Sequence, residues 1–226
     1  MCPRVSGLMS RNAMVRSSSY TIRPGTLPPT IPQKMQSSRG VTTGNVAFAV
    51  MRVVAGTARG RQLRSPRGRA IRPTSDRARE GIFNSLGSLA DLEGATVLDL
   101  FAGTGALGIE ALSRGAAAVT FVDDDRAAVA LIEANLAATG LAGGSVVRAD
   151  AVQFLRNAPT VDVAFADPPY AFDGWQALLA ALHAGIAVLE SDHPVEVGDE
   201  WRVLRVKRYG GTVVTLAGLP PSKGSQ

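Results

Sequence analysis

The sequence predicts an α/β fold built on a mostly parallel sheet, and two observations lead to it. From residue 96 to residue 189, apolar strand-like runs alternate strictly with helix-like runs, which is typical of a parallel sheet covered on both faces. The chain then ends in two strand-like runs, 201–209 and 212–216, joined only by two glycines. So short a connection predicts an antiparallel hairpin at the end of the sheet.

The first 50 residues do not share this alternation. They combine a Ser-rich patch at 17–19, a Pro-rich run at 24–32 and scattered arginines, without a helical or strand period. Such a composition buries too little apolar surface to offset the entropy of ordering, so we expect a disordered tail. A start codon assigned upstream of Met51 would give the same pattern, and an Arg-rich and Ser-rich targeting segment is the alternative interpretation.

Residues 51–75 predict a small basic β-hairpin that leads into a helix. Strand-like runs at 52–56 and 60–63 flank a turn that contains glycine. Polar residues at 74–76 are typical of a helix start, and apolar side chains follow at helical spacing. The apolar positions at helical spacing are Ala78, Ile82, Phe83, Leu86 and Leu89.

The remaining elements follow the alternation. The strands are expected at 96–101, 119–122, 145–148, 161–166 and 185–189, and the helices at 106–114, 126–138, 151–157 and 175–183. With the terminal hairpin this makes a seven-stranded sheet. Large aromatic side chains among these elements are expected in the core, namely Phe83, Trp175 and Trp201.

Charge divides the chain into two unequal parts. Residues 1–75 hold 13 basic residues and no acidic one, whereas residues 76–226 hold 11 basic and 19 acidic residues. A basic segment joined to an acidic body suggests that the first part contacts a polyanion while the second has a different task.

Composition excludes several classes of protein. The chain has one cysteine and two histidines, which rules out a disulfide framework and argues against a histidine-based zinc site or a Ser-His-Asp triad, so no metal is expected. The longest apolar candidate, 177–189, is too short to span a bilayer. We therefore expect a cytoplasmic protein without membrane contact.

A glycine-rich turn follows the first strand of the alternating region. Gly103, Gly105 and Gly108 match the GxGxxG pattern, and Asp123 lies 20 residues after Gly103 at the end of the next strand. The pattern indicates a nucleotide-type site, in which an acid contacts a ribose. Asp99, Asp123, Asp150 and Asp167 should all emerge at the carboxyl ends of strands. Such an acidic rim would repel a pyrophosphate and attract a sulfonium and an ammonium, which favours S-adenosylmethionine over NAD.

The fourth strand of this region ends in Asp167-Pro168-Pro169-Tyr170. Two prolines fix the loop backbone and have no N–H to donate, so the Asp167 carboxylate and the Pro168 carbonyl can both accept hydrogen bonds from one exocyclic amino group. Two acceptors would expose the lone pair of that nitrogen to a methyl group. Tyr170 would stack on a base removed from its neighbours. The alternative interpretation is an ordinary strand end.

These motifs resemble those of class I S-adenosylmethionine-dependent methyltransferases that act on amino nitrogens. Residues 72–84 and 98–116, with 52–56 and 208–210, closely resemble the RsmD family over about residues 51–216. The resemblance implies a Rossmann-like methyltransferase domain at 76–226, an RNA-docking extension at 51–75, and methylation of N2 of one guanine in 16S ribosomal RNA, free or within a partly assembled small subunit. A monomer is expected.

The resemblance also implies a role for each motif residue. The residues expected to contact the cofactor are Asp99, Phe101, Gly103, Gly105, Asp123 and Asp150. The family often has Glu at the position of Asp123. The residues expected to contact the target base are Asp167, Pro168, Pro169 and Tyr170. The basic hairpin region would contact RNA through Arg59, Arg61, Arg64, Arg67, Arg69, Arg72 and Thr74. Arg77 and Arg79 are further candidates for RNA phosphate or the cofactor border, and their alternative role is an ordinary helix surface.

Structural roles compete with several of these assignments. Asp99 could equally accept hydrogen bonds from loop amides, Gly108 could serve close helix–strand packing, and Asp125 could cap the following helix. Three other functions stay open: methylation of adenine N6 or cytosine N4, an NAD-dependent oxidoreductase, and a non-catalytic RNA-binding assembly factor. The acidic rim disfavours the second, and the third leaves the methyltransferase motifs without a role.

Overall fold

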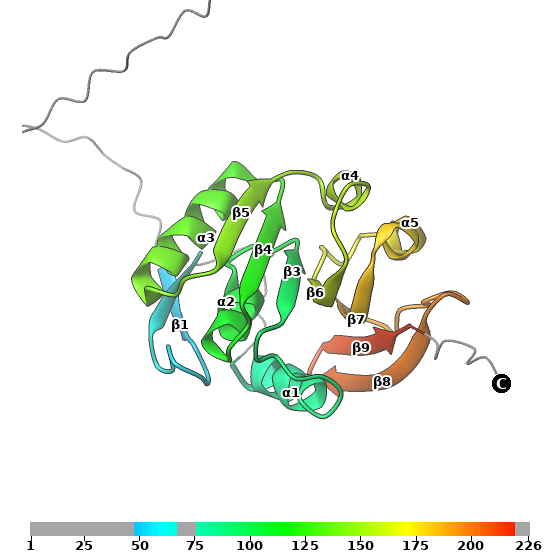
Figure 1. Cartoon of the computed structure of the whole chain (residues 1–226), viewed down its shortest axis with the longest axis horizontal. Coiled ribbons are helices and arrows are strands. Elements are labelled where there is room, and N and C mark those ends of the chain that lie inside the picture. The colour runs from blue at the N-terminus through cyan, green and yellow to red at the C-terminus, as the bar shows by residue number, and fades with distance from the viewer. Residues whose placement is uncertain (1–47, 67–75, 220–226) are drawn as a thin grey trace, which may run out of the picture. The chain divides into compact units, whose positions relative to one another are not determined.

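The computed structural model describes residues 48–66 and 76–219 (Figure 1). The expected tail up to residue 47 and four of the predicted RNA contacts, Arg67, Arg69, Arg72 and Thr74, lie outside them. No helix within the described residues is long and apolar enough to cross a membrane.

A seven-stranded sheet organises the body of the chain, with the strand order β5-β4-β3-β6-β7-β9-β8. In Figure 1, β5 to β7 run from left to right, and β9 and β8 lie below β7. Strands β3 to β7 pair in parallel, and β9 lies antiparallel between β7 and β8. The predicted mostly parallel sheet with an antiparallel hairpin at its end is confirmed. Its strands are β3 Thr96–Leu100, β4 Ala118–Asp123, β5 Gly144–Arg148, β6 Val161–Ala166, β7 Ala184–Ser191, β8 Arg202–Tyr209 and β9 Thr212–Gly218.

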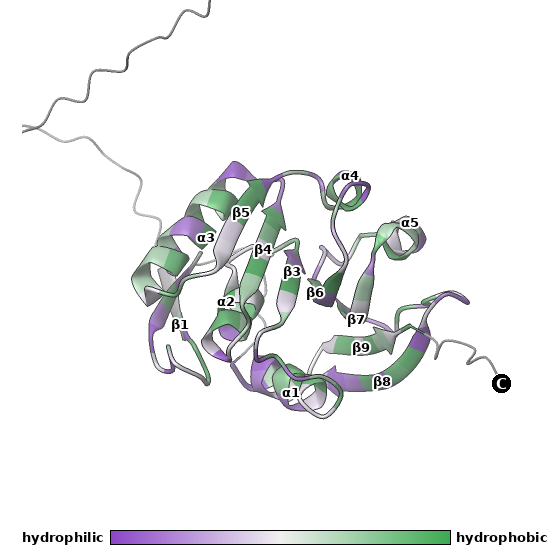
Figure 2. Cartoon of the chain, in the orientation of Figure 1, coloured by the Kyte–Doolittle hydropathy of each residue, from purple (hydrophilic) through white to green (hydrophobic). Residues whose placement is uncertain are grey.

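Helices connect the parallel strands and cover them. They are α1 Asp76–Leu86, α2 Ala106–Ser113, α3 Arg126–Thr139, α4 Ala151–Leu155 and α5 Trp175–Ala181. Successive residues of a strand point to opposite faces of the sheet. Phe165 of β6 accordingly joins a cluster with α1, α2 and α3, while its neighbour Ala164 joins a second cluster with α4 and α5. Figure 2 shows hydrophobic residues along the central strands between these layers.

The aromatic residues expected in the core divide into two groups. Phe83 and Trp201 are buried, which confirms their predicted place, and the Trp201 indole N–H donates to the Leu179 carbonyl at 3.2 Å. Trp175 is only partly buried and contacts the edge of Phe172, with 5.3 Å between ring centroids.

The N-terminal hairpin is present, but its strands differ from those predicted. β1 Phe48–Arg52 pairs antiparallel with β2 Gln62–Pro66, so β1 begins before the expected boundary at residue 51. Residues 53–61 form the connection instead of two short strands. The end of α2 holds that connection, because Thr57 N–H donates to the Ser113 carbonyl at 2.7 Å and Ala58 N–H to the Ser113 hydroxyl at 2.9 Å.

Helix α1 ends earlier than its apolar spacing predicts. It stops at Leu86, just before Gly87, so Leu89 lies beyond the helix to which its spacing assigned it and is 37% exposed. A glycine after the last apolar position is a typical helix end, and here it outweighs the periodicity.

Arg79 is buried, which corrects the expectation that it contacts RNA or the cofactor. Its guanidinium donates to the Arg52 carbonyl and to Asp76 Oδ1, the latter at 2.7 Å, and its Nε lies 3.8 Å from Glu110 Oε2. Glu110 is also buried and accepts from the N–H groups of Val54 and Ala55. Arg79 therefore joins α1 to the hairpin and to α2.

Candidate active site

The carboxyl ends of β3, β4 and β6 meet around one cavity of about 330 Å³. Ligands of open α/β sheets bind in this position, beyond the carboxyl ends of parallel strands. The cavity gathers most of the predicted site, and its walls come from the glycine loop, the β4 end and the β6 end. Predicted residues that line it are Asp99, Phe101, Gly103, Asp123, Asp167, Pro168, Pro169 and Tyr170.

The glycine loop turns sharply between β3 and α2. Gly103 and Gly105 have φ values of 56° and 75°, a left-handed conformation that glycine adopts without a steric penalty. Gly105 is the N-cap of α2 and has no side chain to bond the helix N–H groups. Gly108 has a different role: a Cβ there would lie 2.3 Å from a ring carbon of Phe121, which confirms its predicted part in close helix–strand packing.

Asp99 supplies the acceptor that Gly105 lacks. Its Oδ2 accepts the Gly108 N–H at 2.9 Å, in the first turn of α2, while the residue is only 2% exposed. Burial raises the pKa of Asp99 to about 8, the Gly108 hydrogen bond opposes that rise, and the charges of Asp167 and Asp123 add to it. The proposed loop-amide role of Asp99 is thus present, and the side chain still borders the cavity.

Asp123 bonds the glycine loop from the neighbouring strand. Its two carboxylate oxygens accept from Gly103 N–H at 2.8 Å and from Asp125 N–H at 3.0 Å. Burial raises its pKa, the two hydrogen bonds lower it, and the charges of Asp124 and Asp125 raise it. Asp125 also caps α3 through a 2.8 Å bond from Ala127 N–H, which confirms its predicted structural role.

The cavity therefore concentrates acidic side chains. Asp99, Asp123 and Asp167 line it together with Asp124 and Asp125, and none of the lining residues in the described ranges, 48–66 and 76–219, is a lysine or an arginine. Like charges at short range disfavour one another, which is part of the reason why the pKa values of Asp99 and Asp123 are raised. A ligand that carries positive charge would relieve this repulsion, whereas a pyrophosphate would increase it. The residues present thus fit S-adenosylmethionine and not NAD.

The β6 end forms the outer wall of the cavity. Asp167 is partly buried, Pro168 is buried, and Tyr170 is 51% exposed at the mouth. The loop then turns back, because Phe172 N–H donates to the Pro169 carbonyl at 2.8 Å. This arrangement leaves the Tyr170 ring accessible to a flat partner that enters from solvent.

Phe101 reaches the same wall from the glycine loop. It is the one non-glycine residue with a positive φ, 55°, among the residues that the structure describes. Its ring contacts that of Phe172 with 5.2 Å between centroids, and Phe172 in turn contacts Trp175. An aromatic row thus supports the cavity beside the Asp167–Tyr170 loop.

Two predicted cofactor residues do not line the cavity. Gly105 acts through the backbone of the loop, as its place at the helix N-cap requires. Asp150 is exposed and caps α4, where it accepts from Gln153 N–H at 2.8 Å. Its contact with an adenine amino group stays a prediction.

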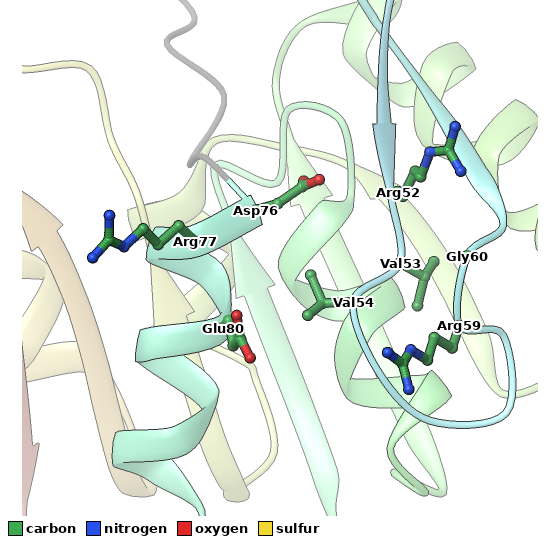
Figure 3. Close-up of a pocket in the computed structure, with 8 residues that line it drawn as sticks. All are labelled: Arg52, Val53, Val54, Arg59, Gly60, Asp76, Arg77 and Glu80. Carbon is green, nitrogen blue, oxygen red and sulfur yellow. The ribbon is translucent and has the colours of Figure 1, made fainter.

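The predicted RNA contacts that the structure describes lie on the hairpin. Arg59, Arg61 and Arg64 are all exposed. Arg59 borders a second hollow of about 330 Å³ between the first turns of α1 and the 52–60 segment, which Arg52, Asp76, Arg77 and Glu80 also line. Figure 3 shows that the Arg77 side chain points away from the 52–60 segment. The arginines are accessible to a polyanion, and their contact with RNA stays a prediction.

Sequence reasoning missed three residues of the site. Met51 lines the cavity from the end of β1, and Thr104 lines it from the glycine loop, with its hydroxyl 3.8 Å from the Met51 sulfur. Asn135 of α3 is buried behind them and bonds the Thr104 carbonyl at 2.8 Å. Nothing local marks these residues, because their contacts join positions 31 and 53 residues apart.

Comparison with known proteins adds a family to this geometry. Residues 51–218 match the family described as Conserved hypothetical protein 95. YlbH of Bacillus subtilis (strain 168), provisionally named an rRNA methyltransferase, is 39% identical over 182 residues, which cover 74% of this chain and 97% of that protein. Ribosomal RNA small subunit methyltransferase D of Haemophilus influenzae is 34% identical over 174 residues, 71% of this chain and 89% of that protein. Among solved structures, yhhF of Escherichia coli, provisionally named a methyltransferase, has a TM-score of 0.67 at 33% identity and covers 76% of this chain and 98% of its own.

Proposed function

Because the chain belongs to the family described as Conserved hypothetical protein 95, the RsmD family of rRNA methyltransferases, we propose that it methylates N2 of a guanine in 16S ribosomal RNA. Its relatives support the coarser activity, methyl transfer from S-adenosylmethionine to ribosomal RNA. The choice of guanine and of N2 rests on the family resemblance of the motifs at 72–84 and 98–116.

One observation carries the proposal: the acidic cavity and the Asp167–Tyr170 loop share one wall. A cationic cofactor in the cavity and a base at the mouth would therefore meet beside Asp167. Gly103, Asp123 and Asp99 would hold the cofactor, since they surround the cavity at the strand ends. When bound, S-adenosylmethionine supplies a methyl group on a positively charged sulfur.

The protein's contribution to the reaction is to position the amino nitrogen. The Asp167 carboxylate and the Pro168 carbonyl would accept the two N–H groups of the amino nitrogen, which directs its lone pair toward the cavity. Tyr170, exposed at the mouth, would stack on the base once it leaves its neighbours. Alignment of the reacting atoms would supply most of the acceleration, and the methylated nitrogen is acidic enough to release its proton without a strong base. No covalent enzyme intermediate is needed.

RNA would approach over the basic hairpin. Arg59, Arg61 and Arg64 are exposed on the extension whose Met51 borders the cavity. Contacts between arginine and phosphate release counterions, so binding is expected to weaken steeply as the salt concentration rises. RNA binding that is insensitive to salt would remove these arginines from the substrate surface.

The decisive experiment identifies the methylated nucleoside. The protein is incubated with labelled S-adenosylmethionine and with either 16S rRNA or partly assembled small subunits from a strain that lacks the modification, and the RNA is digested and analysed by mass spectrometry. N2-methylguanosine supports the proposal. N6-methyladenosine or N4-methylcytidine would replace its base assignment, because the Asp167–Tyr170 loop recognises an amino group and not one base. No label in RNA from either substrate would contradict it.

A further inference from the structure

Asn135 is a buried polar residue that no part of the proposed mechanism uses. It lies in the last turns of α3 with a relative exposure of 0%. Its side chain makes three hydrogen bonds, all of them to backbone groups far away in the sequence. A buried amide is expected to satisfy its polar atoms, and the choice of partners shows which segments it holds together.

Two of the hydrogen bonds join Asn135 to the N-terminal hairpin. Asn135 Oδ1 accepts from the Arg64 N–H at 2.8 Å, and Nδ2 donates to the Arg64 carbonyl at 3.0 Å. The amide thus binds both backbone groups of one β2 residue. β2 has β1 on one edge, so Asn135 fixes the other side of the hairpin against α3.

The third bond reaches the glycine loop. Asn135 Nδ2 also donates to the Thr104 carbonyl at 2.8 Å, between Gly103 and Gly105. On the opposite side Thr104 Oγ1 contacts the Met51 sulfur at 3.8 Å, and Met51 belongs to β1. The glycine loop is therefore held between α3 and the hairpin. The Asn135 amide bonds the glycine loop at Thr104 and the hairpin at Arg64.

We infer that Asn135 is a positioning residue that couples the seating of the basic hairpin on α3 to cofactor binding at the glycine loop. The inference rests on the proposed function, because the cofactor and the RNA are assigned there. Thermodynamic coupling is reciprocal, so a cofactor that orders the loop also orders the hairpin, and RNA on the hairpin strengthens cofactor binding. The hairpin thus acts as part of the cofactor site and not as an independent RNA module.

Other bonds hold the hairpin without reaching the cavity. Glu110 accepts from the N–H groups of Val54 and Ala55, and Ser113 accepts from Ala58. Neither Glu110 nor Ser113 lines the cavity. Loss of these bonds would loosen the hairpin alone, whereas loss of the Asn135 amide releases the hairpin and the glycine loop together.

The test compares Asn135→Ala with Thr139→Ala in the full-length chain. Thr139 is equally buried one turn further along α3, but its hydroxyl bonds only the Leu136 carbonyl of the same helix. Affinity for S-adenosylhomocysteine is measured by calorimetry, and hydrogen exchange of peptides that cover residues 48–66 is followed with and without that ligand.

In the wild type, S-adenosylhomocysteine is expected to slow exchange in the hairpin. Asn135→Ala is expected to weaken affinity by about tenfold and to abolish the effect of the ligand on hairpin exchange, and Thr139→Ala to retain both. If Asn135 served stability alone, Asn135→Ala would lower the midpoint of unfolding but leave the affinity and the effect of the ligand on hairpin exchange intact. That result would overturn the inference.

Asn135→Asp covers the case in which the alanine variant fails to fold. It keeps the size and the acceptor for Arg64 N–H but faces the Thr104 and Arg64 carbonyls with an ionised group. Its affinity relative to the wild type should therefore recover as the pH falls and the carboxyl regains a proton to donate. A ratio independent of pH would contradict the coupling. Absence of ligand binding by the wild type would instead overturn the proposed function, and the inference with it.

Discussion

Acidic side chains at two places in the fold, Glu110 of α2 and the aspartates of the cavity, have opposite environments. Glu110 of α2 is fully buried, but Arg114 lies 2.8 Å from it, Arg79 approaches within 3.8 Å, and two N–H groups of the hairpin donate to it. Asp99 and Asp123 share their cavity with Asp167, and the part of the chain that the structure describes contributes no basic side chain to the lining.

The difference separates a structural site from a binding site. A buried charge is expensive unless it is paired, so a protein that leaves several carboxylates together holds free energy that a cation can recover on binding. The raised pKa values of Asp99 and Asp123 are the mark of that unfavourable state. The negative charge of Glu110 is already balanced by neighbouring groups within the fold, and we expect the role of Glu110 and these partners to be stability alone.

The largest effect is expected on stability, from a substitution beside Glu110. Arg79→Met should lower the free energy of unfolding by about 3–5 kcal/mol, because it leaves Glu110 with fewer partners and frees the Arg52 carbonyl. Urea denaturation measures it. Arg77→Met, at an exposed position of the same helix, should change stability by less than about 0.5 kcal/mol. Equal effects would break the distinction between the two environments.

The next largest effect is a loss of catalysis, expected from a substitution among the aspartates of the cavity. Asp167→Ala should reduce methyl transfer by roughly 10²–10³-fold, because the amino nitrogen loses a charged acceptor, while affinity for S-adenosylhomocysteine changes little. Single-turnover assays with labelled cofactor measure the rate. Asp173→Ala, which removes an exposed acid six residues later, is the control and should retain activity. Near-normal turnover of the Asp167 variant would refute the assigned role.

A smaller loss of cofactor affinity is expected at the β4 end. Asp123→Ala should weaken binding by roughly tenfold or more, since it removes the carboxylate that bonds Gly103 N–H as well as the acceptor for a ribose. Calorimetry decides the point. Asp124→Ala, an exposed neighbour that lines the same cavity, should have a weaker effect. Unchanged affinity after loss of Asp123 would remove it from the ribose.

The smallest effect concerns pH and Asp99. Its pKa of about 8 exceeds the ordinary value of 3.8, so the folded protein keeps a proton that the unfolded chain loses, and stability contributed by this group falls as the pH rises between the two values. A cationic ligand favours the ionised form, so affinity should rise by a few-fold as the pH approaches about 8. Asp99→Asn should make both the stability and the ligand affinity less dependent on pH, which thermal unfolding and calorimetry at a series of pH values measure.

Local patterns of the sequence predict much of this molecule. The alternation of apolar runs predicts the parallel strands, and the glycines at 103–108 predict a tight turn with a helix packed closely on the sheet. Those features depend on residues that are neighbours in the chain, so spacing alone reveals them.

The parts that could not be predicted depend on distant contacts. Helical spacing already places Arg79 on the apolar face of α1, three and four residues before Ile82 and Phe83, but only the fold places Glu110 and Arg52 around it. The same holds for Met51, which closes the cavity from the hairpin, and for Asn135, whose partner Arg64 lies 71 residues away.

Phe101 illustrates how the fold tolerates local strain. A non-glycine residue with φ of 55° carries a steric penalty of about 1–2 kcal/mol, which a glycine would not. The wild-type chain therefore keeps a less stable turn in exchange for an aromatic wall supported by Phe172. Phe101 thus lowers stability in favour of ligand binding. Selection of this chain for heat resistance alone would be expected to replace Phe101 early and to damage the cavity that it lines.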